Sequence, residues 1–559
     1  MRSLLFGVFY FLLIITCFSQ AGDRLWIQFT DKNNGPYLIS QPLDFLSQKS
    51  VDRRTKQGIV ITNNDIPVTP AYLDSIRNTG VNIMHTSKWF NAATIQTTDS
   101  AAIAKILSFP FVKNTIDTVA KRSSNKTMLK DKFELENKYI EANTFKTQAL
   151  DYGASATQTT MINLDKMHDK GYRGDSMVIA VLDNGFNNVP TYSAFDSLWL
   201  ENRILGTRDF YTGDTNVFND GSHGMNVLSV MGANLPGIMV GAAPKASYWL
   251  CRTEISSEQR LEEDNWVAAA EFADSVGADI ITSSLGYSNG MNSPSIDHTY
   301  AEMDGNTTRI TIGADIAATK GILVVNSAGN EGASVWRYVN APADGDSVLS
   351  VGAVSSSGAY AFFSSQGPTA DGRIKPNVSA LGLGAAVIIG DSLAGFSSGT
   401  SFSAPLISGA AACLWQANPT KTSMEIFNAI EKSSSQYDNP DNFIGYGIPD
   451  FNCADLLLKD STCPEPPIPV APDSNLLYKP FPNPFRNSFE VWVSLEPVET
   501  GTIKIYNLVG QEVLTNEFTS NIGGEYQLII QAPKEWFSGV YIVEIFTRKQ
   551  NYSGKLVKF

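Results

Sequence analysis

SSGTSFSAP, residues 397–405, joins a tight turn to the expected start of a helix, and Ser401 lies at its centre. Gly399 and Thr400 precede the serine and Pro405 follows it, a pattern typical of a helix N-terminus, where the first backbone N–H groups have no partner inside the helix. Such N–H groups can stabilise a negative charge that develops on a bound oxygen. The small-residue run ISGAAACLWQ, residues 407–416, predicts a helix packed deep in a domain that holds Ser401 rigidly.

With 559 residues, of which 43% are hydrophobic and 18% charged, the chain is globular and too long for one core. Its net charge of −14 is unevenly spread. Residues 22–150 are basic, with 17 Lys or Arg and 12 Asp or Glu. Residues 151–559 are acidic, with 24 Lys or Arg and 44 Asp or Glu. Opposite charges favour docking of the early segment on the later one, although a chance imbalance on solvated faces gives the same count. The acidic body argues against a nucleic-acid partner, because it repels phosphate.

The first residues predict export. Arg2 precedes the apolar run LLFGVFYFLLIITCF, and small residues follow it, which predicts a secretory signal peptide at residues 1–22. A membrane anchor is the alternative, but the run is short for a span. No later segment has an apolar run of spanning length, so we expect no transmembrane segment after the signal is removed.

Four cysteines remain after Cys17 leaves with the signal, and three pairings are open in an oxidising compartment. We favour Cys453 with Cys463, because both lie near the end of one expected domain. Cys413 lies in the small-residue helix and is expected to be a buried thiol.

The segments before residue 151 predict a small domain and a linker. Residues 23–119 mix short β-type runs (WIQFT, GIVIT, VNIMHTS, FVKNTID) with helical patterns at PAYLDSIRNT and TDSAAIAKIL, which predicts a small α+β domain. Residues 120–150 are polar and charged and predict an exposed linker that proteases can cut.

Residues 151–460 predict a parallel sheet between helical layers. Apolar runs without alternation recur at residues 177–182 and in ASYWLCRT, DIITSSLG, GILVVNSAGN and SVLSVGAVS, and helical patterns separate several of them. Functional groups should then gather at the carboxyl ends of the strands. Asp183 ends one such strand, His223 begins a helical run 40 residues later, and Ser401 follows after another 178 residues. Acyl transfer needs these three residue types: a nucleophile, a base and a carboxylate that orients the base.

Seven sequence blocks in this order resemble the signature blocks of the subtilase family of serine proteases: VIAVLDNGF, DGSHGMNVLSVMGA, ITSSLG, LVVNSAGNEG, FSSQGPTADGRIKPNV, SSGTSFSAPLISGAAA and GYGIPDF. The resemblance implies that Asp183 is the triad carboxylate, His223 the general base and Ser401 the nucleophile. It also implies that the side-chain amide of Asn330 helps to form the oxyanion hole.

The same resemblance implies a substrate groove and a precursor. Two segments should bind an extended peptide and form the walls of the pocket for the residue before the scissile bond, with a preference for an uncharged, fairly large side chain: Ser283, Ser284, Leu285 and Gly286, and Ser327, Ala328 and Gly329. Residues 23–119 resemble the inhibitory prosegment of secreted subtilisin-like proteases. No cofactor is needed for the chemistry; a structural calcium is a tendency of the family, and the sequence identifies no site for it.

Two blocks depart from the family pattern. Met225 and Asn226 stand where a threonine is usual after the His–Gly pair, and Asn377 and Leu381 stand where Asp and a small residue are commoner. These departures put in doubt the packing behind His223 and any ion bound near the KPNV loop, but they replace no reacting group.

The end of the chain predicts an accessory domain. Residues 461–475 form a Pro-rich linker, and the alternating runs of residues 476–559 predict a small β-sandwich. YKPFPNPF, IKIYNLVGQEV and GVYIVEIF resemble the C-terminal sorting domain that Bacteroidetes-type bacteria use for type IX secretion, which implies contact with that machinery and a secreted or cell-surface location. The alternative is a generic accessory β domain.

The sequence therefore predicts a secreted serine endopeptidase that acts on proteins or peptides and is made as an inactive precursor. A surface adhesin or peptide-binding module on the same scaffold is the alternative, because a fold does not fix a function. A lipase is disfavoured, since the Gly-x-Ser-x-Gly elbow and the Ser-first order are missing.

Overall fold

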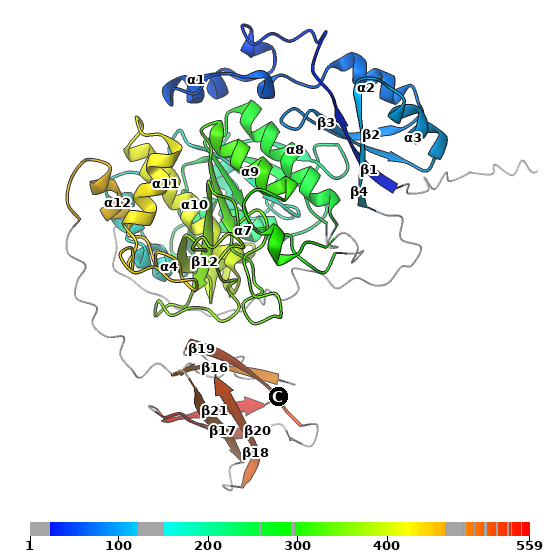
Figure 1. Ribbon diagram of the computed structural model, residues 1–559. Coiled ribbons are helices and arrows are strands. Elements are labelled where there is room, and N and C mark those ends of the chain that lie inside the picture. The colour runs from blue at the N-terminus through cyan, green and yellow to red at the C-terminus, as the bar shows by residue number, and fades with distance from the viewer. Residues whose placement is uncertain are drawn as a thin grey trace, which may run out of the picture.

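The computed structural model describes residues 23–120, 150–255, 259–291, 297–463 and, with short gaps, 485–558. The expected signal peptide and most of both expected linkers lie outside these residues. Figure 1 shows the N-terminal domain in blue beside helices α8 (Leu261–Val276) and α9 (Arg309–Thr319) of the central domain.

The central domain is built on a seven-stranded sheet in which all neighbours are parallel. Most of its strands are buried along their whole length, as the unbroken apolar runs predict. The predicted parallel sheet is therefore confirmed. Its strands, in spatial order, are β13 (Val378–Leu381), β12 (Val348–Val354), β11 (Leu323–Ser327), β10 (Ile280–Ser283), β5 (Val178–Asp183), β9 (Ser247–Arg252) and β6 (Ile204–Asp209).

Helices cover both faces of this sheet. Alternate residues of β5 point to opposite faces: Ile179 and Val181 belong to one core, whereas Val178 and Ala180 belong to the core under α8 and α9. Among the described residues the domain also contains two short hairpins, β7 (Asn234–Leu235) with β8 (Met239–Val240) and β14 (Ala385–Gly390) with β15 (Leu393–Ser397), and, besides α10 (Thr400–Ala417), the helices α4 (Ala156–Met161), α5 (Leu164–Asp169), α6 (Asp196–Leu200), α7 (His223–Gly232), α11 (Ser423–Lys432) and α12 (Phe451–Leu457).

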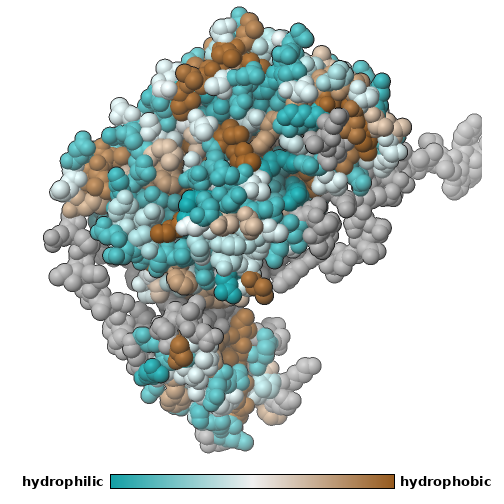
Figure 2. Space-filling view, viewed as in Figure 1, coloured by the Kyte–Doolittle hydropathy of each residue, from teal (hydrophilic) through white to brown (hydrophobic). Residues whose placement is uncertain are grey.

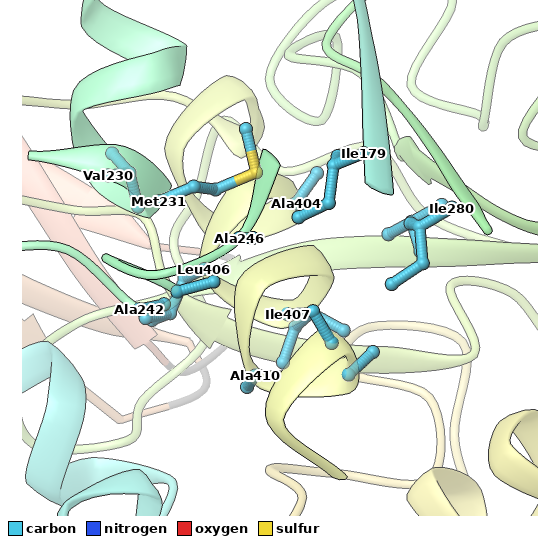
Figure 3. Packing of buried hydrophobic residues seen from close by; sticks show 14 of the residues in the cluster. Ile179, Val230, Met231, Ala242, Ala246, Ile280, Ala404, Leu406, Ile407 and Ala410 are labelled. Atoms are coloured by element: carbon cyan, nitrogen blue, oxygen red, sulfur yellow. The ribbon is translucent and has the colours of Figure 1, made fainter. Parts of the chain in front are cut away.

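Helix α10 (Thr400–Ala417) runs through the first of these cores and is buried from Thr400 to Trp415. Figure 3 shows Ala404, Leu406 and Ile407 of this helix among residues that come from other elements, including Ile179 and Ile280. Small side chains let the helix approach its neighbours closely. The buried Ser408 hydroxyl also lies 2.8 Å from that of Thr282, which ties α10 to β10.

The N-terminal domain is a four-stranded antiparallel sheet in the order β2-β3-β1-β4 with three α-helices, as the α+β pattern predicts. One prediction was wrong: GIVIT, residues 58–62, is not a strand, and Val60 is 75% exposed. The elements are β1 (Asp23–Phe29), α1 (Gln48–Lys56), α2 (Pro70–Arg77), β2 (Asn82–Ser87), β3 (Ala92–Thr97), α3 (Ser100–Leu107) and β4 (Val112–Ala120).

The C-terminal strands form two antiparallel sheets around one apolar core, consistent with the predicted β-sandwich. One sheet pairs β16 (Ser488–Leu495) with β19 (Gly524–Gln531). The other has the order β18 (Glu512–Ser520), β17 (Glu499–Asn507), β20 (Gly539–Phe546) and β21 (Asn551–Lys558).

The cysteines are placed as predicted. Cys453 and Cys463 form a disulfide, and Cys413 is a buried thiol. Within the described ranges, no helix combines the length and apolar character needed to cross a bilayer. On the face in Figure 2, apolar residues lie in separate patches among hydrophilic ones.

The close approach of α10 to its neighbours can be tested at Gly409. A Cβ atom there would lie 2.6 Å from the Cβ of Ala242. We expect Gly409→Ala to cost about 1–3 kcal/mol of stability, because a well-packed core does not admit an extra methyl group. Thermal unfolding measures the loss as a drop in Tm. Gly35→Ala is the control, since its nearest neighbours would be 3.5 Å away; an equal Tm for both variants would contradict the prediction.

Candidate active site

Asp183 and His223 meet at the carboxyl end of strand β5, an interior strand of the seven-stranded sheet. Asp183 is the last residue of that strand and is fully buried, and His223 is the first residue of α7. The Nδ1 atom of His223 lies 2.7 Å from Oδ1 of Asp183. Because an ionised carboxylate can only accept a hydrogen bond, Nδ1 carries the proton and Nε2 is left with its lone pair. This is the arrangement that a general base requires.

The glycine that follows His223 lets the two elements come this close. A Cβ atom on Gly224 would lie 2.6 Å from the carbonyl oxygen of Gly185 and 2.9 Å from the Cβ of Asp183. Only a residue without a side chain therefore fits where α7 begins against the end of β5.

Ser401 is the second residue of α10 and is 4% exposed. The ring of the next residue, Phe402, has its centroid 6.0 Å from that of the His223 imidazole, which places the start of α10 beside the base. The hydroxyl of Ser284 donates to the backbone carbonyl of Ser401 over 2.9 Å. The serine is thus held both by its helix and by one of the predicted pocket walls.

Asn330 is exposed, and its side-chain oxygen faces the start of α10. This oxygen accepts a hydrogen bond from the backbone N–H of Thr400 at 2.9 Å, and the Thr400 hydroxyl lies 3.0 Å from it. With the amide oxygen engaged in this way, the NH₂ group of Asn330 is turned away from Thr400. The contact fixes the amide beside the residue that precedes Ser401.

The two predicted pocket walls lie next to each other. They follow β10 and β11, which pair in register, and the side-chain amide of Asn326 donates to the carbonyl oxygens of Leu285 and Ser327 at 2.9 and 2.8 Å. Ser283 differs from the other wall residues, because its hydroxyl accepts from the indole N–H of Trp266 and its side chain is fully buried against α8. The other wall residues are Ser284, Leu285, Gly286, Ser327, Ala328 and Gly329.

The N-terminal domain docks on α8 through buried ion pairs. The carboxylate of Asp274 is fully buried and lies 2.6 Å from Arg53, 2.8 Å from Arg54 and 2.9 Å from Lys88. Asp65 of the N-terminal domain also contacts Arg54, at 2.9 Å. The three cations keep the pKa of Asp274 below its usual value although burial acts against this. The opposite charges of the two segments therefore meet at this face.

Two further carboxylates of α8 hold the N-terminal domain. Glu271 accepts from the backbone N–H groups of Lys88 and Trp89 at 2.7 and 3.1 Å, and Asp264 accepts from the Thr94 hydroxyl at 2.9 Å. Burial raises the pKa of Glu271 and of Asp264.

Sequence reasoning missed α1 and its two arginines. The segment QKSVDRRTK has one aliphatic residue, so no apolar periodicity marks the helix, and its buried face is made by Ser50, Arg53 and Arg54. The only signals in the sequence are the adjacent arginines and the positive charge of the early segment.

Two of the residues that depart from the family pattern, Asn226 and Asn377, make specific side-chain hydrogen bonds. The amide of Asn226 donates to the carbonyl of Ile388 at 2.6 Å. Asn377 accepts from the ammonium of Lys375 at 2.9 Å and donates to Glu431 at 2.7 Å. The ammonium group of Lys375 thus lies at the KPNV loop, residues 375–378. Burial lowers the pKa of Lys375 to about 8. Among the residues that the structure describes, no three His, Cys, Asp or Glu side chains gather as a metal site.

We expect His85 to make the docking of the N-terminal domain pH-dependent. Burial lowers its pKa from 6.5 to about 4; Arg208 and Arg24 add to this, whereas Asn265 and Asp209 oppose it. After release His85 regains its ordinary pKa, so it binds a proton more readily in the released domain than in the docked one. Its contribution to docking is therefore complete above pH 6.5 and is lost as the pH falls toward 4. We expect docking to weaken by at most about tenfold per pH unit in this range.

The measurement uses the Ser401→Ala chain cut in the linker by an added protease, with dissociation of the N-terminal domain followed by size-exclusion chromatography from pH 7 to pH 4. The raised pKa values of Glu271 and Asp264 act in the opposite direction, because these groups take up protons in the docked state. His85→Gln isolates the histidine and should dissociate less on acidification. Equal pH profiles for the two chains would contradict the assignment.

Comparison with known proteins identifies related families along the chain. Three family models match the chain: the Peptidase S8 propeptide domain of Bacteroidota at residues 24–134, the subtilase family at residues 174–447, and the secretion system C-terminal sorting domain at residues 479–558.

Curated relatives match the central domain. Subtilisin E of Bacillus subtilis (strain 168) is 30% identical over 297 residues, which are 52% of this chain and 68% of that protein. Subtilisin J of Geobacillus stearothermophilus is 31% identical over 52% of this chain and 68% of that protein. The thermophilic serine proteinase of Bacillus sp. (strain AK1) is 28% identical over 54% of this chain and 65% of that protein. The chain therefore belongs to the subtilase family, as a serine endopeptidase made as a precursor with a propeptide and a C-terminal sorting domain for export.

Proposed function

We propose that this exported endopeptidase hydrolyses peptide bonds with Ser401 as nucleophile, His223 as general base and Asp183 as the carboxylate that orients the base. The observation that carries the proposal is the 2.7 Å contact between Nδ1 of His223 and Oδ1 of Asp183 at the end of β5. Asn330 contacts the backbone of Thr400, one residue before the proposed nucleophile, at 2.9 Å.

The proposed reaction uses only protein side chains and water. Oγ of Ser401 attacks the carbonyl carbon of the scissile bond while its proton passes to Nε2 of His223. The backbone N–H of Ser401 and the NH₂ group of Asn330 stabilise the oxyanion. The carbon–nitrogen bond then breaks as His223 gives the proton to the leaving amine. A water molecule, activated by the same imidazole, hydrolyses the acyl-enzyme and restores Ser401.

The substrate is proposed to bind as an extended strand along the segment Ser284–Gly286. Backbone N–H and C=O groups there can pair with a peptide, and the side chain before the scissile bond would enter between the two walls. Ser283 contributes through its backbone alone, since its hydroxyl is held by Trp266.

The N-terminal domain is proposed to inhibit the enzyme until it is released. It is anchored on α8 by the Asp274 ion pairs, and the end of its last strand lies on the same helix, where Val119 packs with Leu261. The C-terminal domain is proposed to engage the type IX secretion machinery, in keeping with the sorting-domain match.

Replacing the proposed nucleophile tests self-processing. We expect Ser401→Ala to give a longer, unprocessed chain that cleaves no casein and does not react with a fluorophosphonate, because the attacking oxygen is gone. Intact mass, casein cleavage and fluorophosphonate labelling measure the three effects. Normal maturation of this variant in a host without other extracellular proteases would refute self-cleavage.

Replacing Asn330 tests the oxyanion hole separately from the nucleophile. We expect Asn330→Leu to lower kcat by about 10²–10³-fold with little change in KM, since a donor that acts mainly in the transition state is lost. Asn439→Leu, at an exposed asparagine, is the matched control. A fall in kcat of less than about threefold would remove Asn330 from the mechanism.

A further inference from the structure

Helix α1 of the N-terminal domain reaches the edge of the central sheet that is opposite the proposed catalytic groups. Figure 1 shows this helix apart from the four-stranded sheet of its own domain and over the central domain. Gln57, the residue after α1, donates to the carbonyl of Gly321 at 2.8 Å and accepts from the N–H of Ser423 at 2.9 Å. Gly321 precedes β11, whereas Asp183 is the last residue of the parallel strand β5. Helix α1 therefore lies at the amino ends of the strands.

Two helices of the central domain end at this edge. Helix α8 has its C-cap at Gly277 and leads into β10, and helix α9 has its C-cap at Lys320 and leads into β11. Crossover helices of a parallel sheet run back from the carboxyl ends of the strands to the amino ends, so their C-termini gather there. The last carbonyl groups of a helix have no partner inside it and carry partial negative charge. The fold therefore prepares this edge for a cation.

Arg53 of α1 provides the cation. Its Nε donates to the carbonyl of Lys320 at 3.1 Å, and its Nη1 donates to the carbonyl of Ala278. Its Nη2 lies 2.6 Å from Oδ1 of Asp274 and 3.4 Å from the carbonyl oxygen of the same residue. Arg53 is 5% exposed. All three nitrogens of the guanidinium thus have an acceptor on the central domain.

The neighbouring Arg54 depends more on its own domain. It contacts Asp274 at 2.8 Å, but it also contacts Asp65 and the Ser50 hydroxyl, both of the N-terminal domain, at 2.9 and 2.6 Å. For Arg53 the same hydroxyl is 3.5 Å away. The acceptors of Arg53 are therefore the ones that stay together when the N-terminal domain leaves.

The acceptors around Arg53 are held by the central domain itself. The N–H of Ala278 donates to the carbonyl of Ala273 in α8 at 2.9 Å, which fixes the turn after that helix. The N–H of Leu323 donates to the carbonyl of Asp279 at 3.0 Å, which joins the segment before β11 to the segment before β10. The site therefore does not depend on α1 for its shape.

This arrangement suits a guanidinium better than an ammonium group. The acceptors surround a planar fork with three separate nitrogens, whereas the single nitrogen of a lysine reaches fewer of them. The side chains of the central domain that bear charge here are Asp274 and Asp279, which pairs with Lys49 of α1 at 2.8 Å, and Lys320, which pairs with Asp65 at 3.2 Å. Among the described residues the two carboxylates outweigh the one ammonium group, so the vacated site attracts a cation.

We propose that the central domain has a guanidinium-binding site at the amino ends of β10 and β11, which Arg53 fills in the precursor and an arginine side chain of another protein fills in the mature enzyme. Release of the N-terminal domain removes the donor from the Asp274 carboxylate and from the carbonyls of Ala278 and Lys320. An arginine of a bound protein restores these contacts. The proposal rests on the proposed release of the N-terminal domain, and it adds a binding site at the edge of the sheet away from the catalytic groups.

Methylguanidinium tests the site in the docked state. The full Ser401→Ala chain is cut in the linker, and dissociation of the N-terminal domain is followed with and without millimolar methylguanidinium. We expect the ion to weaken docking where Arg53 is present, because the two compete. In the Arg53→Ala chain the same ion should strengthen docking, because it fills the vacated acceptors. Methylammonium at equal concentration is the control for charge and ionic strength and should have little effect on either chain.

A peptide tests whether the site stays open in the mature enzyme. The mature protein is blocked at Ser401 with a fluorophosphonate and titrated by calorimetry with an acetylated peptide of residues 47–57. We expect an Arg53→Lys change in the peptide to weaken binding by about tenfold or more, since the fork of acceptors is no longer filled. Asp274→Asn in the enzyme should remove most of this difference. Binding is counted per labelled enzyme, so partial misfolding of the variant does not change the result.

The outcomes separate two failures. Methylguanidinium that shifts docking of both chains in the same direction, or of neither, overturns the guanidinium site. Equal binding of the arginine and lysine peptides, or no binding of either, also overturns it, while the serine mechanism stands. A protein that neither matures nor labels at Ser401 overturns the proposed function itself, and the docking measurement still tests the site.

Discussion

The position of Ser401 depends on the burial of helix α10. Sixteen consecutive residues of this helix, Thr400 to Trp415, are buried, so its axis cannot shift without disturbing the core on one side of the sheet. Small residues such as Ser408 and Gly409 let the helix pack closely against its neighbours. Ser401, at the N-terminus of the helix, is therefore held in a fixed position. The proposed nucleophile therefore needs no mobile loop to reach its position, because the core fixes the helix that bears it.

The parallel sheet brings the remaining groups to the same place. Asp183 ends β5, and the pocket walls follow β10 and β11, which are its successive neighbours in the sheet. The carboxyl ends of parallel strands lie at one edge, so residues more than a hundred positions apart converge there. The hydrogen bond from Asn326 to both walls and the one from Ser284 to the Ser401 backbone then join the strand ends to α10. Substrate binding and chemistry are in this way held by one continuous set of contacts.

The sequence predicts the sheet and its site more completely than it predicts the docking face. Unbroken apolar runs identify buried parallel strands, and the chain order of Asp183, His223 and Ser401 identifies the residues that the sheet brings together. Helix α1 was missed because its buried face consists of arginines, whose burial depends on Asp274 more than two hundred residues away. Local periodicity reports apolar burial, whereas polar burial is decided by distant partners.

The position of the ion pairs has a consequence for activation. Arg53, Arg54 and Lys88 contact Asp274 in the last part of α8, whereas the linker begins near Leu261 at its first residue. A cut in the linker therefore breaks none of these ion pairs, and we expect the cleaved domain to stay bound. Release must instead separate the buried Asp274 carboxylate from its three cationic partners. This separation is costly, because a buried charge that loses its partner is unfavourable until water solvates it. Cleavage and release are then two distinct steps, and the second is controlled by the electrostatics of α8 and not by the catalytic groups.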